Sequence, residues 1–135
     1  MKRVLVDTLY WVAVIRPNDP HSQWARDVRA SLGQVRLVTT EEVLVECLGF
    51  VSGGGSHIRR IAAAAVEEIL ASDQIEVLPQ SHESFVGGLH LYQRRLDKGY
   101  SLVDCIAMNV MRRQGIREIL TDDHHFAQEG FIPLW

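Results

Sequence analysis

The chain has 135 residues, of which 47% are hydrophobic and 23% are charged, and its net charge is −3. These values are typical of a compact globular domain with a real core, and the negative balance provides no general attraction for nucleic acid. No apolar stretch approaches the roughly 20 residues that a membrane span needs, and the N-terminus becomes acidic too early for a signal peptide. The two cysteines do not indicate a disulfide framework, so we expect a cytoplasmic protein with no membrane partner.

Short apolar runs alternate with longer stretches of helical periodicity along the whole chain. Strands are predicted at residues 3–7, 35–38, 75–78, 118–121 and 131–134. Helices are predicted at residues 8–15, 20–32, 41–51, 57–72, 82–96 and 102–114. Strands that alternate with helices indicate a parallel sheet covered on both faces, with functional sites beyond the carboxyl ends of the strands.

Local signals support these boundaries. The runs Thr39–Glu42 and Ser101–Asp104 each match a capping box, and Gly115 follows a basic last helical turn. The run Ser52–Ser56 has the composition of a linker. The segment before it contains only two predicted strands and could not bury a sheet alone. We therefore expect this run to join two helices within a single domain that spans residues 1–135.

Acidic residues stand in apolar surroundings at four places in the sequence, namely Asp7, Glu46, Asp104 and Asp123. Burial of an unpaired carboxylate costs several kcal/mol, so such a set indicates a shared site with a cation. Each acid also has a simpler interpretation. Asp7 and Asp104 could cap the helices that follow them. Glu46 could reach water from the edge of an apolar face, and Asp123 could belong to a solvated turn, where Asp122 competes for the same role.

The chemistry of the acids favours Mg²⁺ or Mn²⁺, which prefer hard oxygen ligands. The sequence contains no CxxC, HxxxH or HExxH zinc motif, and it contains no GxxxxGK[ST], GxGxxG or GxSxG motif. Carboxylates that hold a divalent ion can activate water and stabilise the leaving oxygen of a phosphodiester. His124 and His125 flank the fourth acid. One of them could contact a phosphate or assist proton transfer, or His125 could simply pack near Phe126.

Together these motifs resemble the PIN domain family, and most closely its toxin ribonucleases of the VapC type. The resemblance covers essentially the whole chain and rests on Val6-Asp7-Thr8, Glu46, Ser101–Cys105, Leu120–Phe126 and the tail Phe126–Phe131. It implies a three-layer α/β/α PIN-like fold with a mainly parallel central sheet of about five strands. The protein would then be a small endoribonuclease that depends on Mg²⁺ or Mn²⁺.

The resemblance also implies roles for individual residues and partners. Asp7, Asp104 and Asp123 would bind the metal. Glu46 would complete the site through a water molecule and help to orient or deprotonate the nucleophile. The expected partners are an RNA substrate, a cognate antitoxin protein and a second copy of the chain in a homodimer.

Two further positions can be compared with the family pattern. Asp97 matches an extra acid that many members carry, and we expect it just outside the metal ligands. Many members have a small hydroxyl residue two positions after the first acid, where this chain has Leu9. Thr8 or Thr121 could supply the hydroxyl group instead.

Two other functions are consistent with parts of the sequence. A catalytically inactive PIN-like scaffold would bind only a partner protein. A phosphoacceptor receiver domain also places acids at strand ends. That class needs an acidic pair after the first strand and a late lysine, whereas Asp7 is followed by Thr8 and no lysine follows Lys98.

The helices near residues 41–72 are rich in apolar residues, more than a small domain needs for its core. We expect part of this surface to bind the antitoxin or a second copy. The residues concerned are Val43, Leu44, Leu48, Phe50, Val51, Ile58, Ile61, Val66, Ile69 and Leu70.

Overall fold

The computed structural model describes residues 1–135 and contains one five-stranded sheet in which every neighbouring pair is parallel. The strand order is β3-β2-β1-β4-β5, so the first strand lies at the centre. The bounds are β1 Arg3–Val6, β2 Arg36–Thr40, β3 Ile75–Leu78, β4 Glu118–Leu120 and β5 Ile132–Leu134. The predicted parallel sheet is therefore confirmed, and each observed strand falls at a predicted position.

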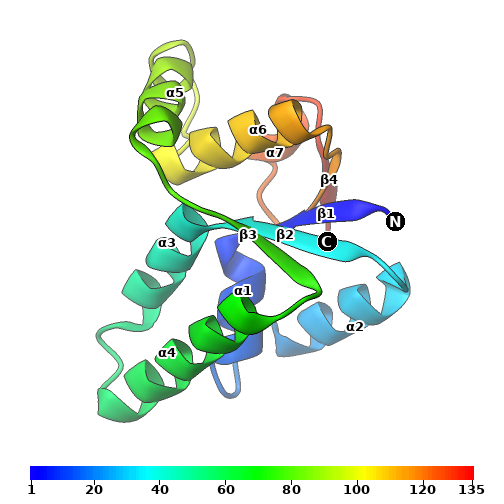
Figure 1. The fold of residues 1–135 in the computed structure, drawn as a ribbon, viewed down its shortest axis with the longest axis vertical. Helices are drawn as coiled ribbons and strands as arrows, with labels where there is room; N and C mark the ends of the chain where they lie inside the picture. Colours follow the sequence, from blue (N-terminus) through cyan, green and yellow to red (C-terminus); the bar gives the residue numbers. More distant parts are fainter.

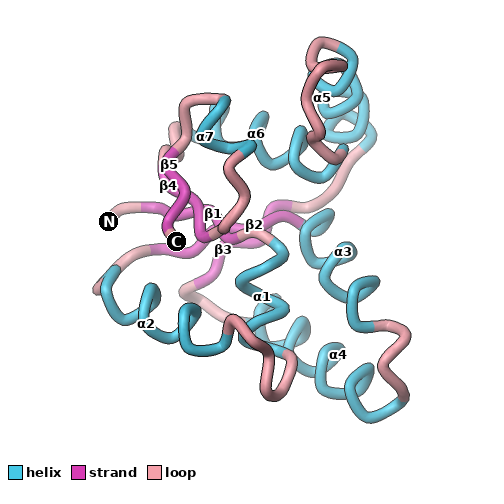
Figure 2. The backbone as a smooth tube through the Cα atoms, turned by 180° about the vertical axis from the view of Figure 1, so that it is seen from behind, coloured by secondary structure: helices cyan, strands magenta, loops and turns pink.

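Helices cover both faces of this sheet, which gives the expected three layers (Figures 1 and 2). One layer contains α1 (Thr8–Ile15), α2 (Ser22–Leu32), α3 (Glu41–Val51) and α4 (Ser56–Ala71). The other contains α5 (His82–Gln93), α6 (Leu102–Gln114) and the short α7 (His125–Gln128). No helix is both long enough and apolar enough to cross a membrane.

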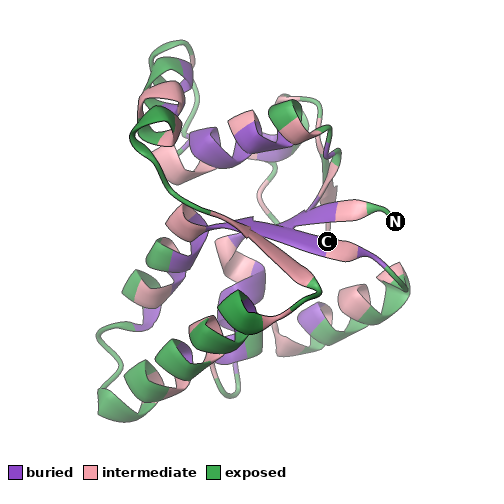
Figure 3. Ribbon diagram, viewed as in Figure 1, coloured by how far each residue is buried: buried purple, intermediate pink, exposed green.

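The two layers have separate hydrophobic cores because side chains alternate along each strand. Val4 and Val6 of β1 face the core formed with α1 to α4, whereas Leu5 faces the core formed with α6 and α7. The buried residues concentrate on the central strands and α6, while α4 and α5 expose much of their surface (Figure 3). The central strands are thus held on both faces, which fixes the positions of their carboxyl ends.

The helix caps agree with the sequence signals at one helix and differ by one residue at another. Ser101 and Asp104 form the predicted capping box of α6, and Gly115 ends that helix with a φ of 69°. The cap of α3 is Thr40, whose Oγ1 accepts a hydrogen bond of 3.1 Å from the Val43 amide. The prediction of Thr39 as the first residue of this cap was wrong because the Thr39 side chain points into the core.

Other differences from the predicted elements are small. The Ser52–Ser56 run joins α3 to α4, as expected. The helix predicted at 82–96 ends at Gln93 and continues as turns, and residues 125–128 form a helical turn that was not predicted. A helix of four residues has too few apolar positions to show a periodicity in the sequence.

Thr39 connects β1, β2 and α1 through its buried hydroxyl group. Its side chain is fully buried. Trp11 Nε1 donates a hydrogen bond of 3.1 Å to Thr39 Oγ1, which in turn donates one of 3.1 Å to the Val6 carbonyl. Val6 directly precedes Asp7, so this contact stabilises the strand end from which the first acid projects.

We expect Thr39→Val to lower the free energy of unfolding by about 1–3 kcal/mol, because it keeps the shape but leaves the Trp11 indole N–H without a partner. Urea denaturation at neutral pH measures this change. Thr39→Ser retains the hydroxyl and should lose only about 1 kcal/mol through the missing methyl group. A valine variant as stable as the parent would show that the indole hydrogen bond contributes nothing.

Candidate active site

The four acids predicted from the sequence come from four separate elements and line the same open cleft of about 620 Å³. Asp7 follows β1, Glu46 lies in α3, Asp104 lies in the first turn of α6, and Asp123 follows β4. The cleft lies at the carboxyl edge of the sheet, where sites of parallel α/β folds are expected. Its other lining residues are Ser101, Thr121, Asp122, His124, His125 and Gln128.

Asp7 is the most buried of the acids, with 7% of its surface exposed. Its carboxylate makes no capping hydrogen bond to α1, so the simple capping interpretation does not describe it. Instead, Thr121 Oγ1 donates a hydrogen bond of 2.9 Å to Asp7 Oδ2. Burial raises the pKa of Asp7 to about 7, and repulsion from Asp104 and Glu46 adds to this, while the Thr8 backbone N–H and the Thr121 hydroxyl oppose it.

Glu46 reaches the cleft from α3, which belongs to the helical layer formed by α1 to α4. Its side chain is half-buried, and Thr8 Oγ1 donates a hydrogen bond of 2.5 Å to Glu46 Oε1. Thr8 opens α1 immediately after Asp7, so one hydroxyl group connects the first strand end to α3. The acid therefore has a fixed orientation and does not simply extend into solvent.

Asp104 is a helix cap and a cleft residue at the same time. Its Oδ2 accepts a hydrogen bond of 3.0 Å from the Ser101 amide, which completes the capping box. Burial raises the pKa of Asp104, and the charges of Asp123 and Glu46 raise it further, whereas hydrogen bonds from Ser101 oppose the shift. The two interpretations of this residue are thus compatible, because the cap anchors the carboxylate at the mouth of the cleft.

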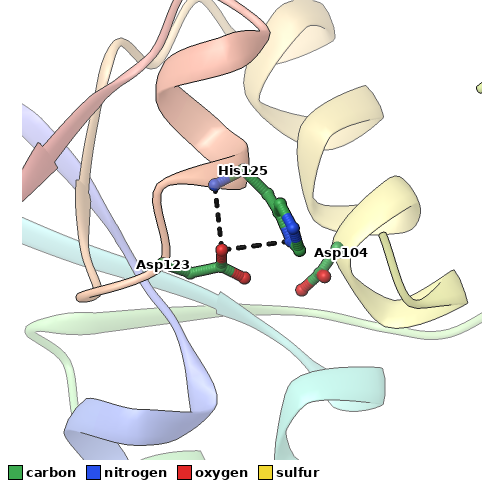
Figure 4. Close-up of side chains that lie close together, drawn as sticks. All are labelled: Asp104, Asp123 and His125. Atoms are coloured by element: carbon green, nitrogen blue, oxygen red, sulfur yellow. Dashed lines mark hydrogen bonds and ion pairs between the residues drawn. The ribbon is translucent and has the colours of Figure 1, made fainter. Parts of the chain in front are cut away.

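Asp123, rather than its neighbour, carries the carboxylate that lies among the other groups. Asp123 Oδ1 accepts a hydrogen bond of 2.9 Å from the His125 amide and lies 3.1 Å from His125 Nδ1. Possible ligand atoms of Asp104, Asp123 and His125 all lie within 4.8 Å of one another (Figure 4). Asp122 is exposed and lies only at the rim. This geometry favours Asp123 as the fourth acid.

The charge of the cleft is unbalanced. Its lining includes five acids and no lysine or arginine. Like charges at this spacing raise the free energy of the folded state unless protons or cations neutralise them. The donor set of carboxylate oxygens with one imidazole fits Mg²⁺ or Mn²⁺, and Asp7 adds a further carboxylate to the same cleft.

The sequence left open which residue supplies the hydroxyl group that many family members carry at the position of Leu9. Thr8 donates to Glu46 and Thr121 donates to Asp7, so neither threonine alone takes that role. Asp97 is not among the cleft residues, since its side chain is 76% exposed and pairs with Lys98 at 3.7 Å.

The ring of His125 packs on Tyr100, with 5.1 Å between ring centroids, and faces the cleft. The structure therefore does not support the packing of His125 near Phe126 as its main contact. Phe126 is fully buried in the core beneath α7. The spacing Asp-x-His at residues 123–125 was the available sequence signal for a local turn that brings imidazole and carboxylate together.

Comparison with known proteins identifies the family. Residues 4–131 match the model of the PIN domain, so the chain belongs to the PIN domain family. The structure is similar to that of VapC20 from Mycobacterium tuberculosis, a toxin that cleaves the sarcin–ricin loop. The TM-score is 0.83, the sequence identity is 26%, and the match covers 96% of each chain. No curated protein sequence matches the chain significantly. The predicted PIN-like fold and the resemblance to VapC-type proteins are confirmed.

The raised pKa of Asp7, about 7 instead of 3.8, predicts how the metal-free protein responds to pH. The native state holds this proton more tightly than the unfolded state, so the contribution of Asp7 to stability is largest at low pH and is lost as pH rises from about 4 to about 7. Asp7→Asn removes the ionisation and keeps an acceptor for Thr121. We expect the variant to melt at least about 3 °C higher than the parent at pH 8 in EDTA.

Thermal melts between pH 5 and pH 8 measure this difference, and the gap between variant and parent should narrow as the pH falls. Asp27→Asn provides the control, because Asp27 is an exposed acid on α2 and should keep the parent profile. If Asp7→Asn melts below the parent at every pH, the Asp7 carboxylate stabilises the fold as an anion, contrary to the burial described above.

Proposed function

We propose that this protein is an endoribonuclease that depends on Mg²⁺ or Mn²⁺ and acts as the toxin of a toxin–antitoxin pair. The observation that carries the proposal is the convergence of Asp7, Glu46, Asp104 and Asp123 in a cleft that no lysine or arginine lines. Membership of the PIN domain family and the similarity to an RNA-cleaving toxin support it. The substrate class proposed is RNA, with a structured stem-loop as the first substrate to test.

Asp104 and Asp123 would hold the metal, with Asp7 or His125 completing the set. An ion bound there supplies Lewis acidity for the phosphodiester and for its attacking water. The residues themselves set the geometry. The capping box fixes Asp104, the His125 amide fixes Asp123, and the Thr121 hydroxyl holds Asp7.

Glu46 is the acid best placed to act on the nucleophile. It faces the other acids from α3, and Thr8 holds one of its oxygens. A carboxylate in this position can orient the attacking water and accept its proton. No side chain needs to form a covalent intermediate, because water is the nucleophile in this scheme.

The alternatives can be compared with this proposal. Membership of the PIN domain family removes the basis for a receiver domain. An inactive scaffold that binds only a partner protein would not need a carboxylate with a pKa of about 7 buried beside other acids, because such a cluster costs stability. The cleavage experiment below separates the scaffold from the enzyme.

Purified protein free of any antitoxin should cleave a sarcin–ricin stem-loop or another structured RNA in Mg²⁺ or Mn²⁺, and EDTA should stop the reaction. Asp104→Asn keeps the hydrogen bond from Ser101 but removes the charge. We expect it to reduce the single-turnover rate by at least about 100-fold. Cleavage that survives both EDTA and this substitution would exclude the metal mechanism.

Asp122 and Asp123 provide a matched pair for the same assay. Both are aspartates of one loop, but only Asp123 lies among the clustered ligand atoms. Asp123→Asn should reduce the rate as strongly as Asp104→Asn does, whereas Asp122→Asn should stay within about threefold of the parent. The reverse result would assign the fourth acid to Asp122.

The structure changes where the binding surfaces for partners are expected. Of the ten apolar residues named for 41–72, four are buried, four are partly buried against the core, and Phe50 and Leu70 are exposed, at 62% and 55%. Part of this surface is therefore uncovered, while the other eight residues pack toward the sheet and α1, and its binding to a partner stays a prediction. A longer exposed apolar stripe follows α5 and the turn after it, and consists of Phe85, Leu89, Tyr92 and Leu96.

We assign the stripe on α5 to a second copy of the chain and the surface around Phe50 to the antitoxin. The spacing of 4 and 3 residues places Phe85, Leu89 and Tyr92 on one face of α5, as in helix pairs that associate, and Leu96 extends the stripe into the turn that follows. Phe50 borders an apolar hollow that Thr8 and Glu46 also line. A peptide bound in this hollow therefore lies next to the cleft and can block it.

The α5 stripe predicts a dimer that a single charge disrupts. Phe85 and Leu70 are exposed to similar extents, 50% and 55%, but lie on α5 and α4. Phe85→Lys should convert the protein to a monomer in light-scattering measurements, because a buried unpaired charge opposes association. Leu70→Lys should leave the dimer intact. A parent that stays monomeric at high concentration contradicts the assignment of the stripe.

A further inference from the structure

Glu129 is a buried acid outside the cleft that contacts three other residues. It follows α7, and only 5% of its side chain is exposed. Arg95 donates to it at 2.8 and 3.3 Å, Arg112 at 2.6 Å, and the Tyr100 hydroxyl at 2.8 Å. None of these four residues lines the cleft.

The contacts connect three segments that lie apart in the sequence. Arg95 belongs to the turn after α5, Arg112 to the last turn of α6, and Glu129 to the end of α7. Hydrogen bonds from Arg95 hold the pKa of Glu129 down at about 2, with Arg112 and Tyr100 contributing, against the effect of burial. Glu129 is therefore an anion at neutral pH, and its hydrogen bonds with Arg95 and Tyr100 hold the loop that precedes α6.

Tyr100 connects Glu129 to His125 at the edge of the cleft. The residue is 4% exposed, so its ring has little freedom. While its hydroxyl group is held by Glu129, its ring packs against the imidazole of His125, with 5.1 Å between centroids. The backbone of Gly99 lies along the same imidazole, since a Cβ atom there would be 3.5 Å from His125 Cε1.

The imidazole of His125 depends on this packing for its position. Its Nδ1 is buried and lies 3.1 Å from Asp123 Oδ1, but the contact does not have the geometry of a hydrogen bond. The ring is therefore oriented by its packing against Tyr100 and Gly99 and by the nearby carboxylate of Asp123. Figure 4 shows this ring between the carboxylates of Asp123 and Asp104. A shift of the ring therefore changes the space between two acids of the site.

We propose that Glu129 is a positioning residue for the cleft, which acts through the Tyr100 hydroxyl to hold the His125 ring between Asp123 and Asp104. Neither Glu129 nor Tyr100 touches the reacting atoms. Their effect on metal affinity rests on the proposed function, whereas their effect on His125 itself does not. The two effects are therefore measured separately.

The first measurement uses metal-free protein and the ring resonances of the six histidines in NMR spectra. Glu129→Gln and Tyr100→Phe should each shift or broaden the His125 ring signals more than those of the other histidines. Glu76→Gln is the matched control. Glu76 also pairs with two arginines, Arg3 at 3.2 Å and Arg36 at 3.6 Å, but lies in β3 away from the cleft. It should leave the His125 signals unchanged.

The second measurement is Mn²⁺ affinity by calorimetry. Residues that orient ligands cost about 10–100-fold in affinity when replaced, and we expect about tenfold for Glu129→Gln and a smaller loss for Tyr100→Phe. Glu76→Gln should bind as the parent does. In a His125→Ala background, Glu129→Gln should cause no additional loss of Mn²⁺ affinity, because Glu129 acts through the His125 ring.

The outcomes separate the inference from the proposed function. The parent protein could bind no Mn²⁺ and cleave no RNA, while its His125 signals still respond to Glu129→Gln. This result would contradict the proposed function but support the positioning role of Glu129. Unchanged His125 signals in folded Glu129→Gln overturn the inference, as does a full additional loss of affinity in the His125→Ala background. If Glu129→Gln does not fold, Tyr100→Phe decides alone, because it keeps the buried ring and removes only the hydroxyl group.

Discussion

Repulsion among carboxylates that the parallel sheet brings to one edge is the constraint on which the rest of this structure depends. In a parallel sheet the carboxyl ends of neighbouring strands meet, and β1 and β4 are neighbours here. Asp7 and the loop with Asp123 must therefore lie close together, and α3 and α6 add Glu46 and Asp104 from the two helical layers. The fold tolerates this cluster because hydroxyl and amide donors hold each acid.

Thr121 is central to this arrangement. Its fully buried hydroxyl group donates to Asp7 and accepts from the Asp123 amide, so one side chain connects the first acid to the fourth. Thr8 directly follows Asp7 in the chain, and its hydroxyl group donates to Glu46. Such donors stabilise charged carboxylates without neutralising them, which leaves their charge available to a cation. The cleft is thus organised by hydrogen bonds from the chain's own residues, and the core on both sides of the sheet supports it.

Two kinds of acid in this protein show how environment decides the role of a carboxyl group. Asp7 is buried among other acids, and burial raises its pKa to about 7. The Glu129 side chain is also largely covered but lies against two arginines, which hold its pKa at about 2. No lysine or arginine side chain lies in the cleft to balance the charge of Asp7. Glu129 is a fixed anion whose partners connect α6, α7 and the loop between α5 and α6.

The features that the sequence determined are those that depend on neighbours along the chain. The alternation of strands and helices, the capping box at Ser101 and Asp104, and the four acids in apolar surroundings can all be seen from local spacing. Contacts between distant segments were decided only by the tertiary structure. The capping-box pattern favoured Thr39 over Thr40 as the cap, and only the packing of β2 against Trp11 shows that Thr39 turns inward.

The same reason explains the other features that could not be predicted. The pairing of Thr8 and Thr121 with two different acids, the location of His125 between Asp123 and Asp104, and the exclusion of Asp97 from the cleft depend on side-chain directions after the layers have packed. The same holds for which apolar residues of 41–72 are covered by the core and which are exposed. Periodicity shows which faces are apolar, but only the packed fold decides which of those faces meet another element and which stay open to a partner.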